Sequence, residues 1–301
     1  MSGSVRGYGA LAVSRAIKDG REPARHEILL DESYRASVFV HAPAGAGAHW
    51  PVVYAHGIQS HPGWFAGSAA HLASAGHPVY QFTRRGSGDN GGARGHAHSL
   101  EQAMADVACW CRFAREHSGC PRVHLLGVSW GGKLLACYAA SGTDGELASL
   151  VLVAPGLCPR VDVGLATKLS IAGALLVNPH QYFDIPLNDP ALFTDNPAMR
   201  AYLEADELGL RRASARFLHV SRQMDRYLAR RPRGSITAPT CLVLASRDRI
   251  IDNARTGRLV DRLTAGWAVT RTLEGAHTLE FEPDTTPLYQ TIAAALEQAQ
   301  T

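Results

Sequence analysis

A serine framed by glycines stands where a strand-like run meets a helix-like run. Residues 127–131 read Gly-Val-Ser-Trp-Gly, after the apolar run 123–126 and before residues 132–136, which favour a helix. In this context Gly-x-Ser-x-Gly is typical of a nucleophile elbow, a sharp turn that lifts the serine hydroxyl out of a sheet. Glycines are required there because a Cβ would collide with the neighbouring strand or the returning helix. Ser129 is therefore the candidate nucleophile.

Two side chains further along the chain could complete a catalytic triad. In hydrolases with such an elbow the acid and then the base follow the serine in the sequence. Asp248 and His277 each stand just beyond an apolar, strand-like run, where open parallel sheets place functional groups. His277 would accept the proton of Ser129, and the carboxylate would orient the imidazole and stabilise its cation. Asp252 competes for the acid role, but we expect it inside the following segment and assign Asp248.

The tetrahedral intermediate of acyl transfer also needs preset hydrogen-bond donors for its oxyanion. The pair His56-Gly57 follows the buried-type strand 51–55 and supplies one side of such a hole. We expect the backbone amides of Ile58 and Trp130 to be the donors. The side chain of His56 is expected to have a structural role, as a hydrogen-bonding partner of the loop.

These motifs, in this order, resemble the α/β-hydrolase superfamily, and within it the capped esterases of the monoacylglycerol lipase and lysophospholipase type. The resemblance covers roughly residues 25 to 298. It implies a mostly parallel eight-stranded sheet with helices on both faces and a helical cap inserted after strand 6. It also implies hydrolysis of a small acyl ester through an acyl-enzyme, without cofactor or metal. The motifs that carry it are His56-Gly57, Arg85-Gly86-Ser87-Gly88, Gly127 to Gly131, Asp248 to Ile251 and Gly275-Ala276-His277.

The periodicity of the chain agrees with an α/β fold. Residues 26–30 and 36–40 read as an antiparallel hairpin, and strand and helix patterns then alternate. Such alternation predicts a mostly parallel sheet that is covered by helices on both faces. The predicted strands are 52–55, 79–82, 123–128 and 150–154, and the predicted helices are 65–75 and 100–117.

The strand rhythm stops at residues 157–235, which prolines break into short helical or irregular pieces. We expect a cap or lid there, between core segments 25–156 and 236–301 and after an N-terminal extension of residues 1–24. One apolar helical stripe in the cap either lines an acyl pocket, touches lipid, or packs on the body of the protein. The expected substrate-binding residues are Trp64 and Phe65, after the oxyanion loop, and Leu165, Leu169 and Leu176 of that stripe, which also holds Ala172 and Leu175.

Composition limits the partners of the protein. The 301 residues carry a formal net charge of +3, with 46% hydrophobic and 19% charged residues, as expected for one compact α/β enzyme. The arginines are mostly scattered, so nucleic acid is not an expected partner. The first twenty residues lack the apolar core of a secretory signal, and no segment is long and apolar enough to span a bilayer. We therefore expect a cytoplasmic protein, and the resemblance to esterases implies a small-molecule acyl substrate.

Other functions share this triad. Proline iminopeptidases also carry a tryptophan after the nucleophile, but the segment 58–61 departs from their oxyanion loop. An aminopeptidase would use the cap acids Glu204, Asp206 and Glu207 to bind a substrate amine, although such a group is more often a solvated helix face. Thioesterases, lactonases and carbon–carbon bond hydrolases remain open. A binding module without catalysis is disfavoured because all three triad positions are filled.

Overall fold

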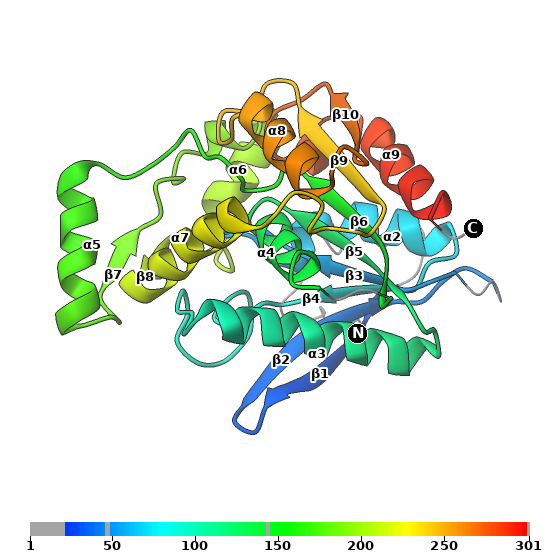
Figure 1. Cartoon of the computed structure of the whole chain (residues 1–301), viewed down its shortest axis with the longest axis horizontal. Coiled ribbons are helices and arrows are strands. Elements are labelled where there is room, and N and C mark those ends of the chain that lie inside the picture. The colour runs from blue at the N-terminus through cyan, green and yellow to red at the C-terminus, as the bar shows by residue number, and fades with distance from the viewer. Residues whose placement is uncertain (1–21, 46–48, 143–144, 300–301) are drawn as a thin grey trace.

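In this computed structural model of the chain, residues 22–45, 49–142 and 145–299 are described. The expected N-terminal extension lies outside the described residues apart from residues 22–24. An eight-stranded sheet forms the centre of the molecule, with the strand order β1-β2-β4-β3-β5-β6-β9-β10 (Figure 1). Its first two strands form an antiparallel hairpin, β2 pairs antiparallel with β4, and the remaining neighbours are parallel.

The strands in the middle of the sheet are buried on both faces. Every residue of β5 (Val123–Val128) and β6 (Leu147–Val153) is buried, as near-continuous apolar runs in a parallel sheet require. The others are β1 (Ala24–Asp31), β2 (Tyr34–His41), β3 (Val52–Ala55), β4 (Val79–Phe82), β9 (Thr240–Ala245) and β10 (Val269–Leu273). The carboxyl ends of β3, β5, β9 and β10 therefore open on one edge of the sheet.

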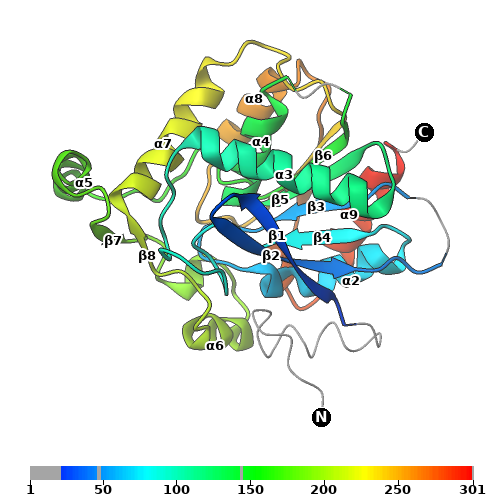
Figure 2. The ribbon, with the colours of Figure 1, turned by 90° about the horizontal axis from the view of Figure 1, so that it is seen from below.

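Helices cover both faces of the sheet. On one face α2 (Ala66–Ser74) and α9 (Thr286–Glu297) contact each other, and on the other α3 (Leu100–Ser118) contacts α4 (Trp130–Ala139). The helix α8 (Asn253–Leu263) packs on β9. Figure 2 shows α3, α4 and α8 on the side of the sheet opposite to α2. The predicted α/β class is confirmed.

A cap is inserted between β6 and β9, after the sixth strand as expected. It contains α5 (Leu165–Val177), β7 (Tyr182–Asp184), the 3₁₀ turn η3 (Pro190–Leu192), α6 (Pro197–Ala205), β8 (Arg212–Ser214) and α7 (Ala215–Arg230). The helix α5 stands at the outer edge of the molecule, beyond β7, β8 and α7, in both views (Figures 1 and 2). The antiparallel pair β7 and β8 was not predicted, because strands of three residues are too short to show periodicity.

Candidate active site

Ser129 lies in the sharp turn between β5 and α4. Its backbone φ of 52° and ψ of −122° are in a region that side-chain-bearing residues rarely adopt. The turn is possible because the flanking residues are glycines: a Cβ on Gly127 would lie 2.6 Å from Gly132 Cα, and one on Gly131 would lie 2.4 Å from Ala55 O. The strain therefore sits at the residue whose hydroxyl the turn presents, as expected for a nucleophile elbow.

Ser129, His277 and Asp248 form one chain of hydrogen bonds. The distance from Ser129 Oγ to His277 Nε2 is 3.0 Å, and His277 Nδ1 lies 2.7 Å from Asp248 Oδ2. The side chains of His277 and Asp248 are almost fully buried. The sequence thus places the three groups at the distances that general-base activation of a serine requires.

The second carboxylate oxygen of Asp248 accepts the backbone N–H groups of Ile250 and Ile251 at 2.8 and 3.0 Å. Burial alone would raise the pKa of Asp248, but His277 and these two N–H groups together hold that pKa below its ordinary value. Asp248 is therefore ionised at neutral pH. The competing acid, Asp252, instead caps α8 by accepting the N–H of Arg255 at 2.9 Å.

The loop after β3 lies against the candidate nucleophile. A Cβ on Gly57 would be 3.3 Å from Ser129 Cβ and 3.1 Å from Ser60 Oγ, which is closer than most Cβ contacts, so glycine suits this approach. Ile58 and Trp130 both line the same pocket as Ser129. Among the residues that the structure describes, neither backbone N–H donates a hydrogen bond to another group. This geometry agrees with an oxyanion hole made by those two amides.

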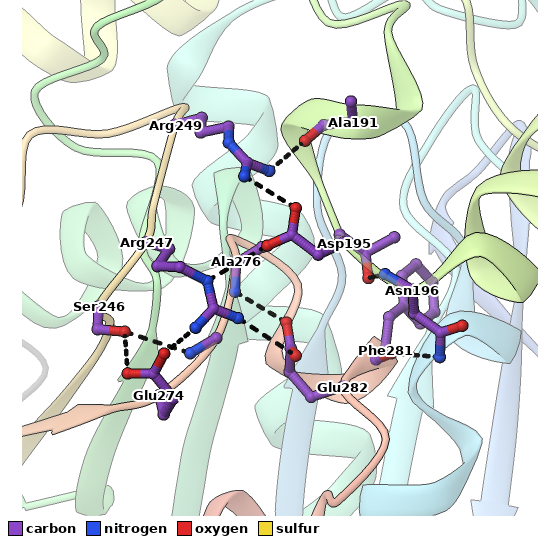
Figure 3. Close-up of polar contacts among 12 residues, drawn as sticks. Ala191, Asp195, Asn196, Ser246, Arg247, Arg249, Glu274, Ala276, Phe281 and Glu282 are labelled. Atoms are coloured by element: carbon purple, nitrogen blue, oxygen red, sulfur yellow. Dashed lines mark hydrogen bonds and ion pairs between the residues drawn. The ribbon is translucent and has the colours of Figure 1, made fainter.

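Ion pairs tie the cap to the loops that carry the acid and the base (Figure 3). The carboxylate of Asp195, between η3 and α6, pairs with Arg247 at 3.2 Å and with Arg249 at 2.8 Å, the two residues that flank the candidate acid. Arg247 also lies 3.8 Å from Glu282 of the base loop, and Glu282 accepts the N–H of Ala276 at 2.8 Å. Most of these groups are partly exposed, so each pair contributes little alone, but together they fix both loops against the cap.

A pocket of about 360 Å³ opens between Ser129 and the cap. Most of its wall is apolar, and α5 and the segment after β7 contribute much of that wall. Four cations and two carboxylates line a more polar part, where the buried Lys133 pairs with Asp225 at 2.8 Å. The apolar lining includes Ile58, Val161, Val163, Ile171, Ala172, Leu175, Ile185, Leu187, Leu218, Ile250 and Ile251, and the charged lining comprises Lys133, Asp162, Lys168, Arg222, Asp225 and Arg226.

The expectation that Trp64 and Phe65 form this pocket is corrected. Both are buried in the core, with 5% and 3% of their surface exposed, and neither lines the pocket. The Trp64 ring packs edge-on against Phe193, whose own ring lies 6.2 Å from that of His277. Trp64 therefore supports the base loop from behind, because the 3₁₀ turn after the oxyanion loop directs it inward.

The expectation for Leu165, Leu169 and Leu176 is also corrected. These leucines are 73%, 66% and 88% exposed on the outer side of α5 and do not line the pocket. The opposite side of the helix, with Ile171 and Leu175, faces the pocket. Because α5 is apolar around most of its circumference, its hydrophobic pattern does not distinguish the two sides.

The cap acids do not converge on the pocket. Glu204 and Glu207 are exposed, whereas the Asp206 side chain is 4% exposed and is bound to the loop after β3. Its carboxylate accepts Trp64 Nε1–H at 2.7 Å and His61 Nε2–H at 3.2 Å. The proton lies on His61 Nε2 because Nδ1 accepts the N–H of Gly63. Asp206 thus fastens the cap to the core and is not available to bind a substrate amine.

Asp206→Asn is expected to lower the free energy of unfolding by about 1 to 3 kcal/mol, because an amide cannot accept from all the donors that surround this carboxylate. Burial alone would raise the pKa of Asp206, but His61 and the hydrogen bonds from Trp64 and Leu208 hold it below the ordinary value of 3.8. A lowered pKa contributes stability above pH 3.8 that is lost as the pH falls below it. Urea unfolding should show a constant difference between variant and wild type from neutral pH to pH 5, shrinking below pH 4. A difference that grows on acidification would contradict this assignment.

Comparison with known proteins places this fold and geometry in a family. A family model described as "Serine aminopeptidase, S33" matches residues 47–284. The chain belongs to this family. A protein named monoacylglycerol lipase from Mycolicibacterium smegmatis is 28% identical to this serine hydrolase over 71% of this chain and 75% of its own length.

Solved structures agree in fold. A monoacylglycerol lipase from Paleococcus ferrophilus has a TM-score of 0.76 at 24% identity, covering 88% of this chain and 99% of its own. A soluble variant of monoglyceride lipase from Saccharomyces cerevisiae has a TM-score of 0.78 at 18% identity, covering 93% and 97%. The predicted α/β-hydrolase fold and the serine ester hydrolase class are confirmed for this family member.

The polar wall of the pocket was not predicted from the sequence. Lys133 stands one helical turn after Ser129, so the spacing of four residues could have indicated that it faces the same side of α4. Within the described ranges, no group of three or more histidine, cysteine or acidic side chains could hold a metal ion. Likewise, none of the described helices is long and apolar enough to cross a membrane.

Proposed function

We propose that this serine hydrolase cleaves the carboxylic ester of an acylglycerol-like or lysophospholipid-like substrate, with Ser129, His277 and Asp248 as its triad. Ser129 attacks the ester carbonyl, and His277 takes the serine proton and passes it to the departing alcohol. His277 then activates the water that hydrolyses the acyl-enzyme. The amides of Ile58 and Trp130 stabilise both tetrahedral oxyanions. The hydrogen-bonded chain Ser129–His277–Asp248, whose serine lines an apolar pocket, carries this proposal.

The pocket supports an acyl ester in particular. Its apolar wall suits an alkyl chain, and its charged part suits a polar leaving group such as glycerol or glycerophosphate. An aminopeptidase needs a free carboxylate for the substrate amine. Both carboxylates in the pocket lining, Asp162 and Asp225, are paired with lysines, and Asp206 is bound to the core. These pairings favour the esterase over the peptidase function.

Acyl chain length provides the test of this function. We expect kcat/KM to rise from acetate through butyrate to octanoate esters, by up to about 0.8 kcal/mol for each buried methylene, until the pocket is full. Prolyl and alanyl anilides should be poor substrates. Steady-state rates on this panel measure both. Faster hydrolysis of the anilides, with no effect of acyl length, would overturn the esterase assignment.

A matched pair of variants on α5 sharpens this test. Ile171→Trp fills the pocket wall and should lower the rate on octanoate more than on acetate. Leu169→Trp adds the same bulk on the exposed side of the helix, and it should leave the ratio of the two rates unchanged. Equal behaviour of the two variants would contradict this placement of the acyl chain.

The exposed side of α5 supports a further part of the proposal, a transient contact of the cap with lipid. The helix α5 lies at the outer edge of the molecule (Figure 1). Its residues Leu165, Leu169 and Leu176 are 73%, 66% and 88% exposed and do not line the pocket. A helix that is apolar on its solvent side can bury that side in the interface of a lipid layer, where long-chain esters reside. The charged rim, with Lys168, stays in water.

The double variant Leu169→Ser, Leu176→Ser should bind phospholipid vesicles at least tenfold more weakly, because two leucines lose about 2 kcal/mol or more of apolar burial. Its rate on a dissolved butyrate ester should stay at the wild-type level. Leu29→Ser is the control, since Leu29 is 53% exposed on β1, away from the cap. Vesicle sedimentation measures binding, and equal binding of all three proteins would refute a lipid contact through α5.

We also propose that the chain is divided into a core, residues 25–156 and 236–301, and a cap, residues 157–235. A cytoplasmic location, expected from the sequence, is part of the proposal as well. The ion pairs of Asp195, the buried bonds of Asp206 and the pair of Lys133 with Asp225 support a separate cap that is fastened to the core.

A further inference from the structure

A buried arginine lies behind the oxyanion loop. Arg84 follows β4 and is 5% exposed. Its Nη2 donates to the carbonyl of Ile58 at 2.7 Å and reaches that of Gly57 at 3.4 Å. Both carbonyls belong to the loop that presents the Ile58 amide to Ser129. The guanidinium therefore contacts the oxyanion loop on the side away from the nucleophile.

The side chain of His56 also binds the Gly57 carbonyl. The backbone N–H of Arg84 donates to His56 Nε2 at 3.2 Å, so the ring proton lies on Nδ1, which donates to Gly57 O at 2.9 Å. Burial, together with the nearby Arg84 charge, lowers the pKa of His56 well below its usual range. The ring is therefore neutral, with one acceptor and one donor nitrogen. The guanidinium of Arg84 thus contacts the Gly57 carbonyl directly, whereas the backbone N–H of Arg84, which a change of side chain leaves in place, orients the His56 ring that holds the same oxygen.

The Gly57 carbonyl and the Ile58 N–H are parts of one peptide unit. This unit is planar and trans, so its carbonyl and its N–H point in opposite directions. A donor that fixes the direction of the Gly57 oxygen also fixes the direction of the Ile58 N–H. Rotation of this peptide would break the hydrogen bonds from His56 and Arg84.

The same guanidinium contacts the other half of the hole. Arg84 Cζ lies 4.8 Å from the centre of the Trp130 ring and 5.1 Å from that of Phe217 on α7. The Trp130 indole is further fixed by its N–H, which donates to Ser221 Oγ at 3.1 Å. A cation over an aromatic face is attracted by the ring. Arg84 therefore joins the loop that carries one amide to the side chain of the residue that carries the other.

The buried guanidinium of Arg84 lowers the stability of the fold. Among the described residues no carboxylate pairs with it, and its Nε and Nη1 are buried without a hydrogen-bond partner. Burial lowers the pKa of Arg84 to about 9. A buried cation that lacks an anionic partner costs stability, and such costs gather at functional sites. Stability alone therefore does not explain an arginine at this position.

We propose that Arg84 is a positioning residue for the oxyanion hole, holding the Gly57–Ile58 peptide and the Trp130 ring so that both amides face the developing oxyanion. The inference rests on the proposed function, since the hole belongs to that reaction. A misplaced donor costs transition-state stabilisation but leaves ground-state binding intact. Loss of Arg84 should therefore lower kcat and spare KM.

Arg84→Met keeps much of the volume and removes the donors and the charge. Its kcat on p-nitrophenyl butyrate is expected to fall by about 10- to 100-fold, with KM within about twofold of wild type. The inhibition constant of a trifluoromethyl ketone, whose adduct with serine carries an oxyanion, should rise by the same factor. The inhibition constant of an ether analogue, which forms no adduct, should stay unchanged. Arg84→Lys keeps the charge and one donor, and its kcat should lie between those of Arg84→Met and wild type.

The neighbouring Arg85 is the matched control. It pairs with Asp31 and Asp106, away from the oxyanion loop, so Arg85→Met should retain wild-type kcat and ketone inhibition. A purely structural role for Arg84 predicts a different pattern: activity lost in proportion to the unfolded fraction measured by circular dichroism, with ketone and ether affinities unchanged per folded molecule. That pattern, or wild-type kcat in Arg84→Met, would overturn the proposal.

Fluorophosphonate labelling of Ser129 separates this inference from the proposed function, because labelling needs the serine and the hole but not the natural ester. A wild-type protein that labels, with Arg84→Met labelling about 10- to 100-fold more slowly, supports the role of Arg84 even if none of the tested esters is hydrolysed. Equal labelling rates in the two proteins would contradict it.

Discussion

Ser129→Ala is expected to be folded and to retain between about 10⁻³ and 10⁻⁶ of the wild-type kcat. The residual rate would come from binding and the oxyanion hole alone. The substitution keeps the Cβ, so it adds no strain at the backbone φ of 52° that the elbow imposes. Steady-state hydrolysis of p-nitrophenyl butyrate measures the loss of kcat, and circular dichroism shows whether the variant is folded.

Ser141→Ala is the control for that experiment. Ser141 is exposed just beyond the other end of α4, so its loss should leave turnover at the wild-type level. If Ser129→Ala kept a tenth of wild-type turnover, Ser129 would not be the nucleophile.

Asp248→Asn is expected to lower kcat by about 10² to 10⁴ with little change in KM. An asparagine keeps the shape of the acid but cannot stabilise the His277 cation that forms when the serine proton is taken. It also offers the imidazole a neutral partner that can select the wrong tautomer. The side-chain oxygen of the asparagine can still accept hydrogen bonds from the backbone N–H groups of Ile250 and Ile251, as Asp248 does, so the loop should stay in place.

Asp252→Asn tests the competing assignment. Asp252 caps α8 and asparagine is an equally good cap, so this variant should be nearly as active and stable as wild type. Steady-state kinetics of both variants on the same ester shows which substitution lowers kcat more. A larger loss in Asp252→Asn than in Asp248→Asn would show that the acid was assigned wrongly.

Local patterns predicted the parts of the molecule that depend on neighbouring residues. The predicted strands 52–55, 79–82 and 123–128 coincide with β3, β4 and β5, because apolar runs of this length between turn signals are typical of buried strands in a parallel sheet. The candidate triad was proposed on the same logic. Once the strands are parallel, residues just beyond their carboxyl ends meet at one edge of the sheet, and Asp248 and His277 do so.

The pocket depends on contacts between distant segments, and here sequence reasoning was less successful. The outer and inner sides of α5 are both apolar, so the choice between Leu169 and Ile171 as pocket wall is made by the packing of the cap. Asp206 and Arg84 likewise owe their roles to partners far away in the sequence, such as Trp64 and Trp130. Nothing in the local pattern of either residue indicates burial, since charged residues are mostly exposed.

The acyl-enzyme tests the central claim most directly. Rapid mixing of the protein with p-nitrophenyl octanoate, followed by acid quenching and peptide mass spectrometry, traps the intermediate before water hydrolyses it. We expect an octanoyl group on the peptide that contains Ser129, formed in wild type and absent from Ser129→Ala. Octanoate release by wild type without that adduct, or with the acyl group on another residue, would contradict it.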